Sequence, residues 1–192
     1  NILRKRTVTP AKGILPPGFP GYNEDLAGIP YDPERARQLL AESSYKQSDN
    51  LPPIVFASSG DGGNTDPLAA ALTIMYSETL GVDIELQQVD WDHFQQDLYR
   101  NEYQMFMLGW VMDYPDPEDF LDKLFYSESP QNEQGYKNDK VDSLLKTARY
   151  EKDQTKRFDM YNDAEQLILD DYAIIPDFWP TEHLLVKPCV KN

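Results

Sequence analysis

The chain has 192 residues, of which 33 are Asp or Glu and 18 are Lys or Arg, so its formal net charge at pH 7 is −15. A surface with this charge repels nucleic acid and anionic membranes and attracts cationic or zwitterionic ligands, which argues against a nucleic-acid partner. The length suits one large domain or two small ones. No apolar run approaches membrane-spanning length, and no segment is typical of a signal peptide.

The chain begins at Asn1 rather than Met and stops soon after a strand-like segment, so we expect a piece of a longer protein. Its one cysteine, Cys189, excludes an internal disulfide and a cysteine-built metal site. His93 and His183 lie ninety positions apart and lack the spacing of zinc ligands. The residues therefore predict no metal and no cofactor.

Apolar periodicity and capping residues predict an alternation of helices and strands after an irregular, Gly- and Pro-rich start that is draped over the fold up to residue 31. The order strand, helix, strand, helix, strand predicts an α/β fold with a mostly parallel, doubly wound mixed sheet flanked by helices. We expect helices at 32–45, 67–80, 90–101, from 116, from 138 or 139, and at 153–170, with strands at 54–57, 82–86, from 105, 173–176 and 184–186.

A glycine-rich turn at residues 58–64 follows the first of these strands and precedes a helix. It lacks the Lys of a P-loop and the glycine spacing of a dinucleotide site, and it carries acids. The pattern favours a flexible loop over a phosphate cradle.

The most informative stretch runs from Met105 to Phe120. It begins as an apolar run, and the prolines at 115 and 117 then force the chain out of the sheet near Asp113. Asp116 and Pro117 are typical of the N-cap and first position of a helix. A strand end that carries an aromatic residue and an acid, just before a helix, is where open α/β sheets bind ligands.

The order of motifs resembles the C-terminal lobe of the dipeptide- and oligopeptide-binding proteins (family 5) of bacterial ABC importers. No motif is specific alone, but together they cover nearly the whole chain. They are Gly13–Gly18, Tyr31–Ala36 with Leu39 and Leu40, Leu80–Val82, Tyr103–Met105, Gly109-Trp110, Asp113–Pro117, Gly135-Tyr136, Asn138, Val141-Asp142, Arg157, Tyr161, Val186–Pro188 and Val190–Asn192.

The resemblance implies a periplasmic-binding-protein-like (type II) fold in which two lobes close over an extended peptide. It implies that Asp113 holds the peptide's α-amino group and that Trp110 forms a flat wall beside it. It also implies that the main chain around Gly109, Trp110 and Val111 bonds the peptide by strand addition, with Met112 as a further ligand-binding residue. Residues 1–192 would be one such lobe, and the missing N-terminal lobe would belong to the same polypeptide.

The resemblance further implies a short peptide as ligand, an ABC permease as membrane partner and no catalysis. The protein would act in the periplasm or on the outer face of the cell membrane, and a lipid anchor on the full-length protein is compatible with this. Some oligopeptide binders carry a cation a few residues before Gly-Trp that meets a peptide carboxylate, but here that stretch is apolar. Either another group binds the carboxyl end of the peptide, or the ligand is a different one, such as a nickel chelate, haem or an oligosaccharide.

The residues of the 105–120 stretch have other readings. Asp113 could be a turn carboxylate that bonds local backbone groups, and Trp110 could be a core residue. Asp116, Glu118 and Asp119 favour helix capping, while a calcium cluster built with Asp113 matches no EF-hand spacing. Asp113 and Asp116 could also be the carboxylate pair of a glycosidase. A protein-interaction module without a ligand cleft is a third class.

Overall fold

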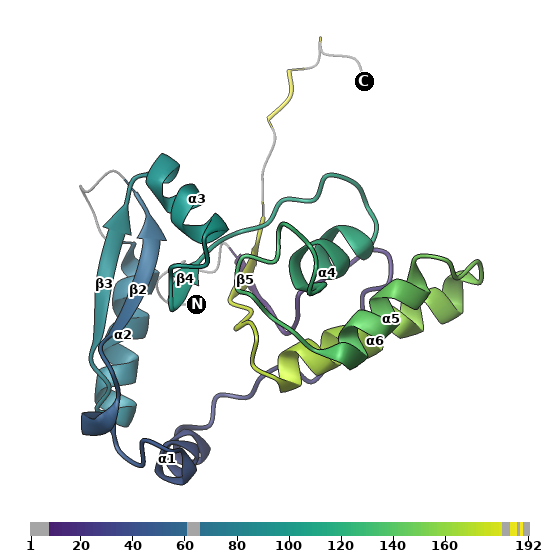
Figure 1. Ribbon diagram of the computed structural model, residues 1–192. Helices are drawn as coiled ribbons and strands as arrows, with labels where there is room; N and C mark the ends of the chain where they lie inside the picture. Colours follow the sequence, from purple (N-terminus) through teal and green to yellow (C-terminus); the bar gives the residue numbers. More distant parts are fainter. Residues whose placement is uncertain (1–7, 61–65, 182–184, 188, 190–192) are drawn as a thin grey trace.

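The computed structural model describes residues 8–60, 66–181, 185–187 and 189. Figure 1 shows a parallel sheet with its helices on the left and the three helices α4, α5 and α6 on the right. Within the described residues the elements are β1 (Val8–Pro10), α1 (Pro33–Glu42), η1 (Ser48–Asn50), β2 (Ile54–Ser59), α2 (Pro67–Leu80), β3 (Ile84–Val89), α3 (Trp91–Tyr99), β4 (Met105–Met107), α4 (Glu118–Phe125), α5 (Asp139–Ala148), α6 (Gln154–Asp170) and β5 (Phe178–Pro180).

The main sheet has the strand order β3-β2-β4, and both pairings are parallel. Three consecutive residues of the central strand, Phe56, Ala57 and Ser58, are buried, so both faces of β2 are covered. The predicted doubly wound α/β arrangement is confirmed. Because the strands run parallel, β2, β3 and β4 all end at the same edge of the sheet, and the chain leaves β4 there.

The antiparallel part lies in a separate sheet, in which β1 pairs with β5 from Val8↔Pro180 to Pro10↔Phe178. The strand predicted at 173–176 is wrong, because Ala173 and Ile174 pack against the helices instead. The strand predicted at 184–186 is not formed either: residues 185 and 186 are exposed and outside any strand, and residue 184 lies outside the described residues. The turn predicted at 58–64 also lies mostly outside them.

Acidic or amide side chains cap five of the six α-helices of the described residues, because such side chains accept hydrogen bonds from the free N–H groups of a first helical turn. The caps are Asp32, Asp66, Asp90, Asn138 and Asp153, each at or directly before a helix start predicted from the sequence. Helix α4 begins one position later than expected, with Pro117 as its N-cap, and Asp116 still accepts a hydrogen bond from the N–H of Glu118 at 3.0 Å.

The cap of α6 yields a stability prediction. Asp153 accepts hydrogen bonds from the N–H groups of Thr155 and Lys156 at 3.0 and 3.2 Å. Replacing Asp153 with Ala should lower the free energy of unfolding by about 1 kcal/mol, measured by urea denaturation, because both N–H groups lose their partner. Asp153→Ser, which restores an acceptor, should recover most of the loss, and equal stability of the Ala and Ser variants would contradict the assignment.

The larger hydrophobic core lies between α4, α5 and α6. Leu121 of α4, Val141 and Leu145 of α5, and Tyr161 and Ile168 of α6 are completely buried. The irregular N-terminal segment also enters this core, through Ile14, Leu15 and Phe19. The expectation that this segment is draped over the fold is therefore wrong: it is irregular, but its apolar side chains are interior.

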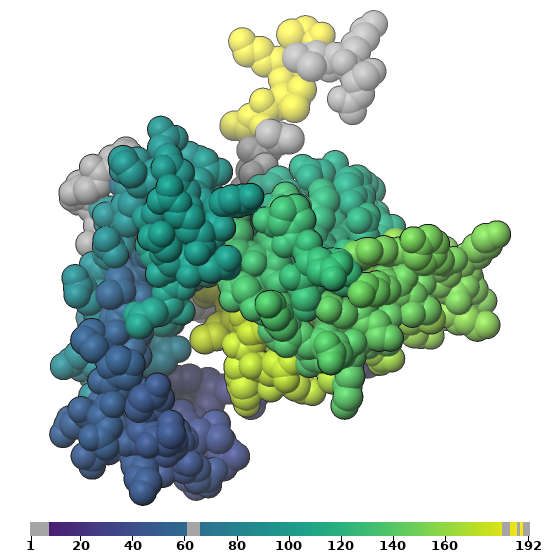
Figure 2. All heavy atoms as spheres, viewed as in Figure 1, coloured from purple at the N-terminus to yellow at the C-terminus, as the bar shows by residue number. Residues whose placement is uncertain are grey.

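A smaller core lies between α3 and the parallel sheet, where Phe94 and Leu98 pack on Ala57. The apolar pattern of residues 90–101 predicts that Trp91 packs beside them, but it stacks on Phe94 and stays half exposed. In Figure 2 the sheet and its helices, coloured blue and teal, lie beside the green residues of α4 to α6.

The spacing of Ala36, Leu39 and Leu40 predicts a buried face for α1. This face is not formed, because no residue of α1 is buried and Leu39 is exposed. Helix α2, apolar on most sides, buries only Ala69 and leaves Ile74 and Met75 exposed. Helix α1 packs against α2, outside the two cores, so its apolar residues find few neighbours.

Candidate functional site

The candidate site is the segment that follows β4 at the carboxyl edge of the parallel sheet. Pairing with β2 ends at Met107, and residues 108–112 belong to no helix, strand or turn. Val111 is 84% exposed and Met112 is 50% exposed, which is unusual for apolar side chains beside a core. At Gly109 a β-carbon would meet no atom within 4 Å, so the main chain there is open to approach.

The main chain of this segment is free to bind. Within the described residues, no hydrogen bond involves the main-chain N–H or C=O of Trp110, Val111 or Met112. Exposed main-chain groups at the end of a strand can pair with an added extended chain. The predicted site residues thus form one continuous, accessible segment.

Trp110 stands at the inner side of this segment. Its ring is half-buried against the larger core, and its Nε1–H donates to Asp119 Oδ2 at 3.2 Å. Part of the ring packs inward, as the core interpretation expects, while the main chain lies in the open segment. The role of Trp110 as a wall beside a ligand stays a prediction. The position of Trp110 is fixed from α4, where Asp119 is the second residue.

The Asp113 carboxylate points outward but has an internal partner. Its side chain is 64% exposed, and its Oδ2 lies 2.7 Å from Nζ of Lys123. The main-chain N–H of Asp113 donates to Asp119 Oδ2 at 2.9 Å. Lys123 also bonds Asp119 Oδ1, so a single ammonium bridges both carboxylates. The assignment of Asp113 to a ligand stays a prediction.

Lys123 and Asp119 were missed by the reading of the sequence, although a signal was present. They stand four positions apart on a predicted helix, the spacing at which an acid and a lysine meet on one helix face. The interpretation of Asp119 as a capping residue is incomplete, since it is completely buried and accepts from three donors.

The electrostatics of this cluster follow from burial and hydrogen bonding. Burial by itself raises the pKa of Asp119, but the bonds from Lys123, the Asp113 N–H and Trp110 outweigh it and hold that pKa below its ordinary value. Hydrogen bonds to Asp113 and then Asp119 raise the pKa of Lys123. Counted by formal charge, the two Asp side chains and Lys123 give this cluster a net charge of −1.

A second ion pair anchors the turn between the segment and α4. The two terminal guanidinium nitrogens of Arg157, Nη1 and Nη2, donate to Asp116 at 2.8 and 2.7 Å. Tyr114 donates its hydroxyl to Glu118 at 2.6 Å, and burial together with this bond raises the pKa of Tyr114 to about 12. The turn that carries Asp113 is thus held from both α4 and α6.

These contacts pair the acids of this turn with cations of the same chain. Burial by itself raises the pKa of Asp116, but the Arg157 guanidinium outweighs it and keeps the pKa low, whereas a glycosidase acid needs a raised pKa. Lys123 bonds one oxygen of Asp113 and one of Asp119, and Arg157 bonds both oxygens of Asp116. Within the described residues, no cluster of His, Cys, Asp or Glu is arranged to hold a metal ion.

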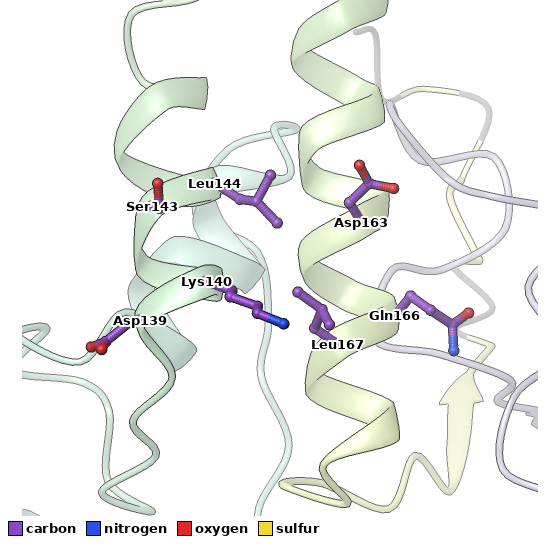
Figure 3. A pocket seen from close by; sticks show the side chains of 7 residues that line it. All are labelled: Asp139, Lys140, Ser143, Leu144, Asp163, Gln166 and Leu167. Carbon is purple, nitrogen blue, oxygen red and sulfur yellow. The ribbon is translucent and has the colours of Figure 1, made fainter.

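A separate groove of about 610 Å³ lies between α5 and α6. Figure 3 shows Leu144 and Leu167 pointing between the two helices, with polar side chains around them. None of the predicted site residues lines this groove.

Comparison with known proteins identifies the family. The model of the middle part of bacterial extracellular solute-binding proteins, family 5, matches residues 1–133. The chain therefore belongs to this family, whose members are solute-binding proteins.

Individual relatives match nearly the whole chain. It is 27% identical over 179 residues to the oligopeptide-binding protein OppA of Bacillus subtilis, a match that covers 90% of the chain and 33% of OppA. It is 30% identical over 191 residues to the heme-binding protein A of Haemophilus influenzae, covering 96% and 34%. The structure of the periplasmic binding protein DppA from Helicobacter pylori with the peptide STSA superimposes with a TM-score of 0.80 at 25% identity, covering 91% and 34%.

The chain thus spans about a third of the length of these relatives. The fold match confirms the predicted periplasmic-binding-protein class. In the part of the chain that the structure describes, no helix has both the length and the apolar character needed to cross a membrane.

Proposed function

We propose that residues 1–192 form one lobe of a two-lobed substrate-binding protein of an ABC importer, and that the lobe binds the amino end of short peptides at Asp113. One observation carries the proposal: an exposed carboxylate directly follows three residues whose main chain has no partner within the described residues. A carboxylate and free main-chain groups in this order match the two features shared by all peptides, a terminal ammonium and a repeating backbone.

The relatives support the same proposal, because OppA of Bacillus subtilis is named an oligopeptide-binding protein and the DppA structure holds the peptide STSA. Membership of a solute-binding family supports a role without catalysis. We further propose that the protein works outside the cytoplasmic membrane with an ABC permease, and that the second lobe lies in the same polypeptide.

Isothermal titration with short peptides tests the proposal in a two-lobed protein that contains this chain. A tripeptide with a free amino end should bind, and the same peptide with an acetylated amino end should bind more weakly because it offers no ammonium. The 192-residue chain alone should bind weakly or not at all, since half of the cleft is absent. Nanomolar binding by the chain alone would overturn the two-lobe proposal, and equal binding of both peptides would overturn the role of Asp113.

Haem is a second candidate ligand, favoured by the 30% identity to heme-binding protein A of Haemophilus influenzae. The cluster of Asp113, Asp119 and Lys123 carries a net negative charge, which disfavours the two carboxylates of haem and favours an ammonium. Titration with haemin, followed by its absorbance, separates the two candidates. Mass spectrometry of the ligand that purifies with the two-lobed protein identifies the solute directly.

A further inference from the structure

The Lys123 ammonium occupies the place where the proposed ligand ammonium would bind. Its Nζ lies 2.7 Å from Asp113 Oδ2 and bonds the buried Asp119 on its other side. A peptide whose amino end binds Asp113 must share that carboxylate with Lys123 or displace it. Within the described residues, Lys123 is the cation recorded as an ion-pair partner of Asp113.

The two carboxylates hold Lys123 unequally. Asp119 is completely buried, so leaving it without a cation would strand a charge in the interior, whereas the Asp113 side chain is 64% exposed and can turn to water. The Lys123 ammonium also lies 4.7 Å from the centre of the Tyr114 ring and 5.8 Å from that of Trp110, within the range of cation–π attraction. Lys123 therefore keeps Asp119 and two aromatic faces when it releases Asp113.

We propose that Lys123 is a displaceable internal counter-ion of Asp113, which the amino end of the ligand replaces while Lys123 stays on Asp119. This inference rests on the proposed function and adds a specificity residue to it. In the empty site Lys123 neutralises Asp113 and lowers its attraction for stray cations. Only a ligand that also bonds the free main chain of residues 110–112 gains enough to take its place.

The proposal predicts a different effect of removing Lys123 from the effect expected if Lys123 contacted the ligand. If Lys123 competes with the ligand, its removal strengthens the binding of a free amino end. If it bonds a ligand carboxylate or only supports Asp113, its removal weakens binding. Lys123→Met alone leaves Asp119 buried without a cation, so it is not a sufficient test.

The double variant Lys123→Met/Asp119→Asn removes this problem. In the wild type, Asp113, Asp119 and Lys123 together have a formal charge of −1. In the double variant Asp113 alone carries −1, so the net charge of the cluster is unchanged. The amide oxygen of Asn at 119 can still accept from the Asp113 N–H and from Trp110. The variant therefore removes the competitor without altering the electrostatic field at long range.

The experiment measures the dissociation constants of a free-amine tripeptide and its N-acetylated form by isothermal titration, using two-lobed protein with and without the substitutions. The double variant should bind the free-amine peptide about two- to fivefold more tightly, the range expected for losing one exposed ion pair, with no gain for the acetylated peptide. Lys123→Arg, which keeps the competing cation, should bind like the wild type.

Each outcome decides the matter. Unchanged or weaker binding of the free-amine peptide by a folded double variant, while the wild type still prefers the free amine, overturns the role of Lys123 and leaves the proposed function standing. No preference for the free amine in the wild type overturns both. Circular dichroism and the urea midpoint establish that the variants are folded.

Discussion

Replacing Asp113 with Asn is expected to weaken the binding of a free-amine peptide to the two-lobed protein by about 2–5 kcal/mol, or roughly thirty-fold to several thousand-fold. In the closed cleft the ligand ammonium loses its water, and without a carboxylate it has no charged partner. Lys123 would remain beside it, held by Asp119, and would repel it. Isothermal titration measures the loss.

Stability should change little in this variant, because the Asp113 side chain is 64% exposed and its main-chain N–H still bonds Asp119. Asp159→Asn is a matched control: it removes the same charge from an exposed position on α6, so it reports any effect of net charge alone. The N-acetylated peptide should bind wild type and variant almost equally. Unchanged affinity of Asp113→Asn for the free-amine peptide would rule out the assigned role.

Features that depend on neighbouring residues could be predicted from the sequence. Asp66 before Pro67 starts α2, and Gly81 ends it in the left-handed conformation with φ of 65°. The site segment was predicted correctly as a strand followed by a helix, but the strand ends at Met107, before the exit near Asp113 that Pro115 and Pro117 indicated. In each case the physical cause lies within a few residues of the feature.

Features that depend on the path of the chain could not be predicted. Asp116 pairs with Arg157, 41 positions away, and Glu165 bonds the N–H of Ile14, 151 positions away. Over such separations, no spacing in the sequence indicates which residues come into contact. The burial expected for α1 failed for the same reason, since an apolar stripe indicates which face packs but not how much protein covers it. The Asp119–Lys123 pair was the exception, because it is local and could have been found.

Glu165 carries the largest expected effect on stability. It is 1% exposed, and its Oε1 accepts from the N–H groups of Ile14 and Leu15 at 2.6 and 3.0 Å, which ties the N-terminal segment to the larger core. Space for this contact requires Gly13, where a β-carbon would lie 2.6 Å from the same oxygen. The N-terminal segment is irregular and buried, so no strand supplies acceptors for its N–H groups, and the Glu165 side chain takes that role.

Glu165→Leu should therefore be less stable than Glu165→Gln by roughly 2–6 kcal/mol in urea denaturation, because two buried N–H groups each lose a bond worth about 1–3 kcal/mol. Both variants are uncharged, so the comparison isolates the hydrogen bonds from the charge. Equal stability of the two variants would mean that the N-terminal segment does not depend on this acceptor.

The pH dependence of stability tests the charge on Glu165 separately. Burial raises the pKa of Glu165 above its ordinary value of 4.5, more than the two backbone bonds lower it. Its stabilising contribution is therefore complete below about pH 4.5 and is lost as the pH rises through the folded-state pKa. Asp116 and Asp119 act in the opposite direction, since their lowered pKa values give stability that is lost only as the pH falls below 3.8.

The measurement is the difference in the free energy of unfolding between wild type and Glu165→Gln at several pH values. The contributions of Asp116 and Asp119 are the same in both proteins and cancel in this difference. The difference should move in favour of the Gln variant as the pH rises from 4.5. A difference in stability that is independent of pH would mean that the pKa of Glu165 is the same in the folded and the unfolded protein, and so would contradict the raised pKa.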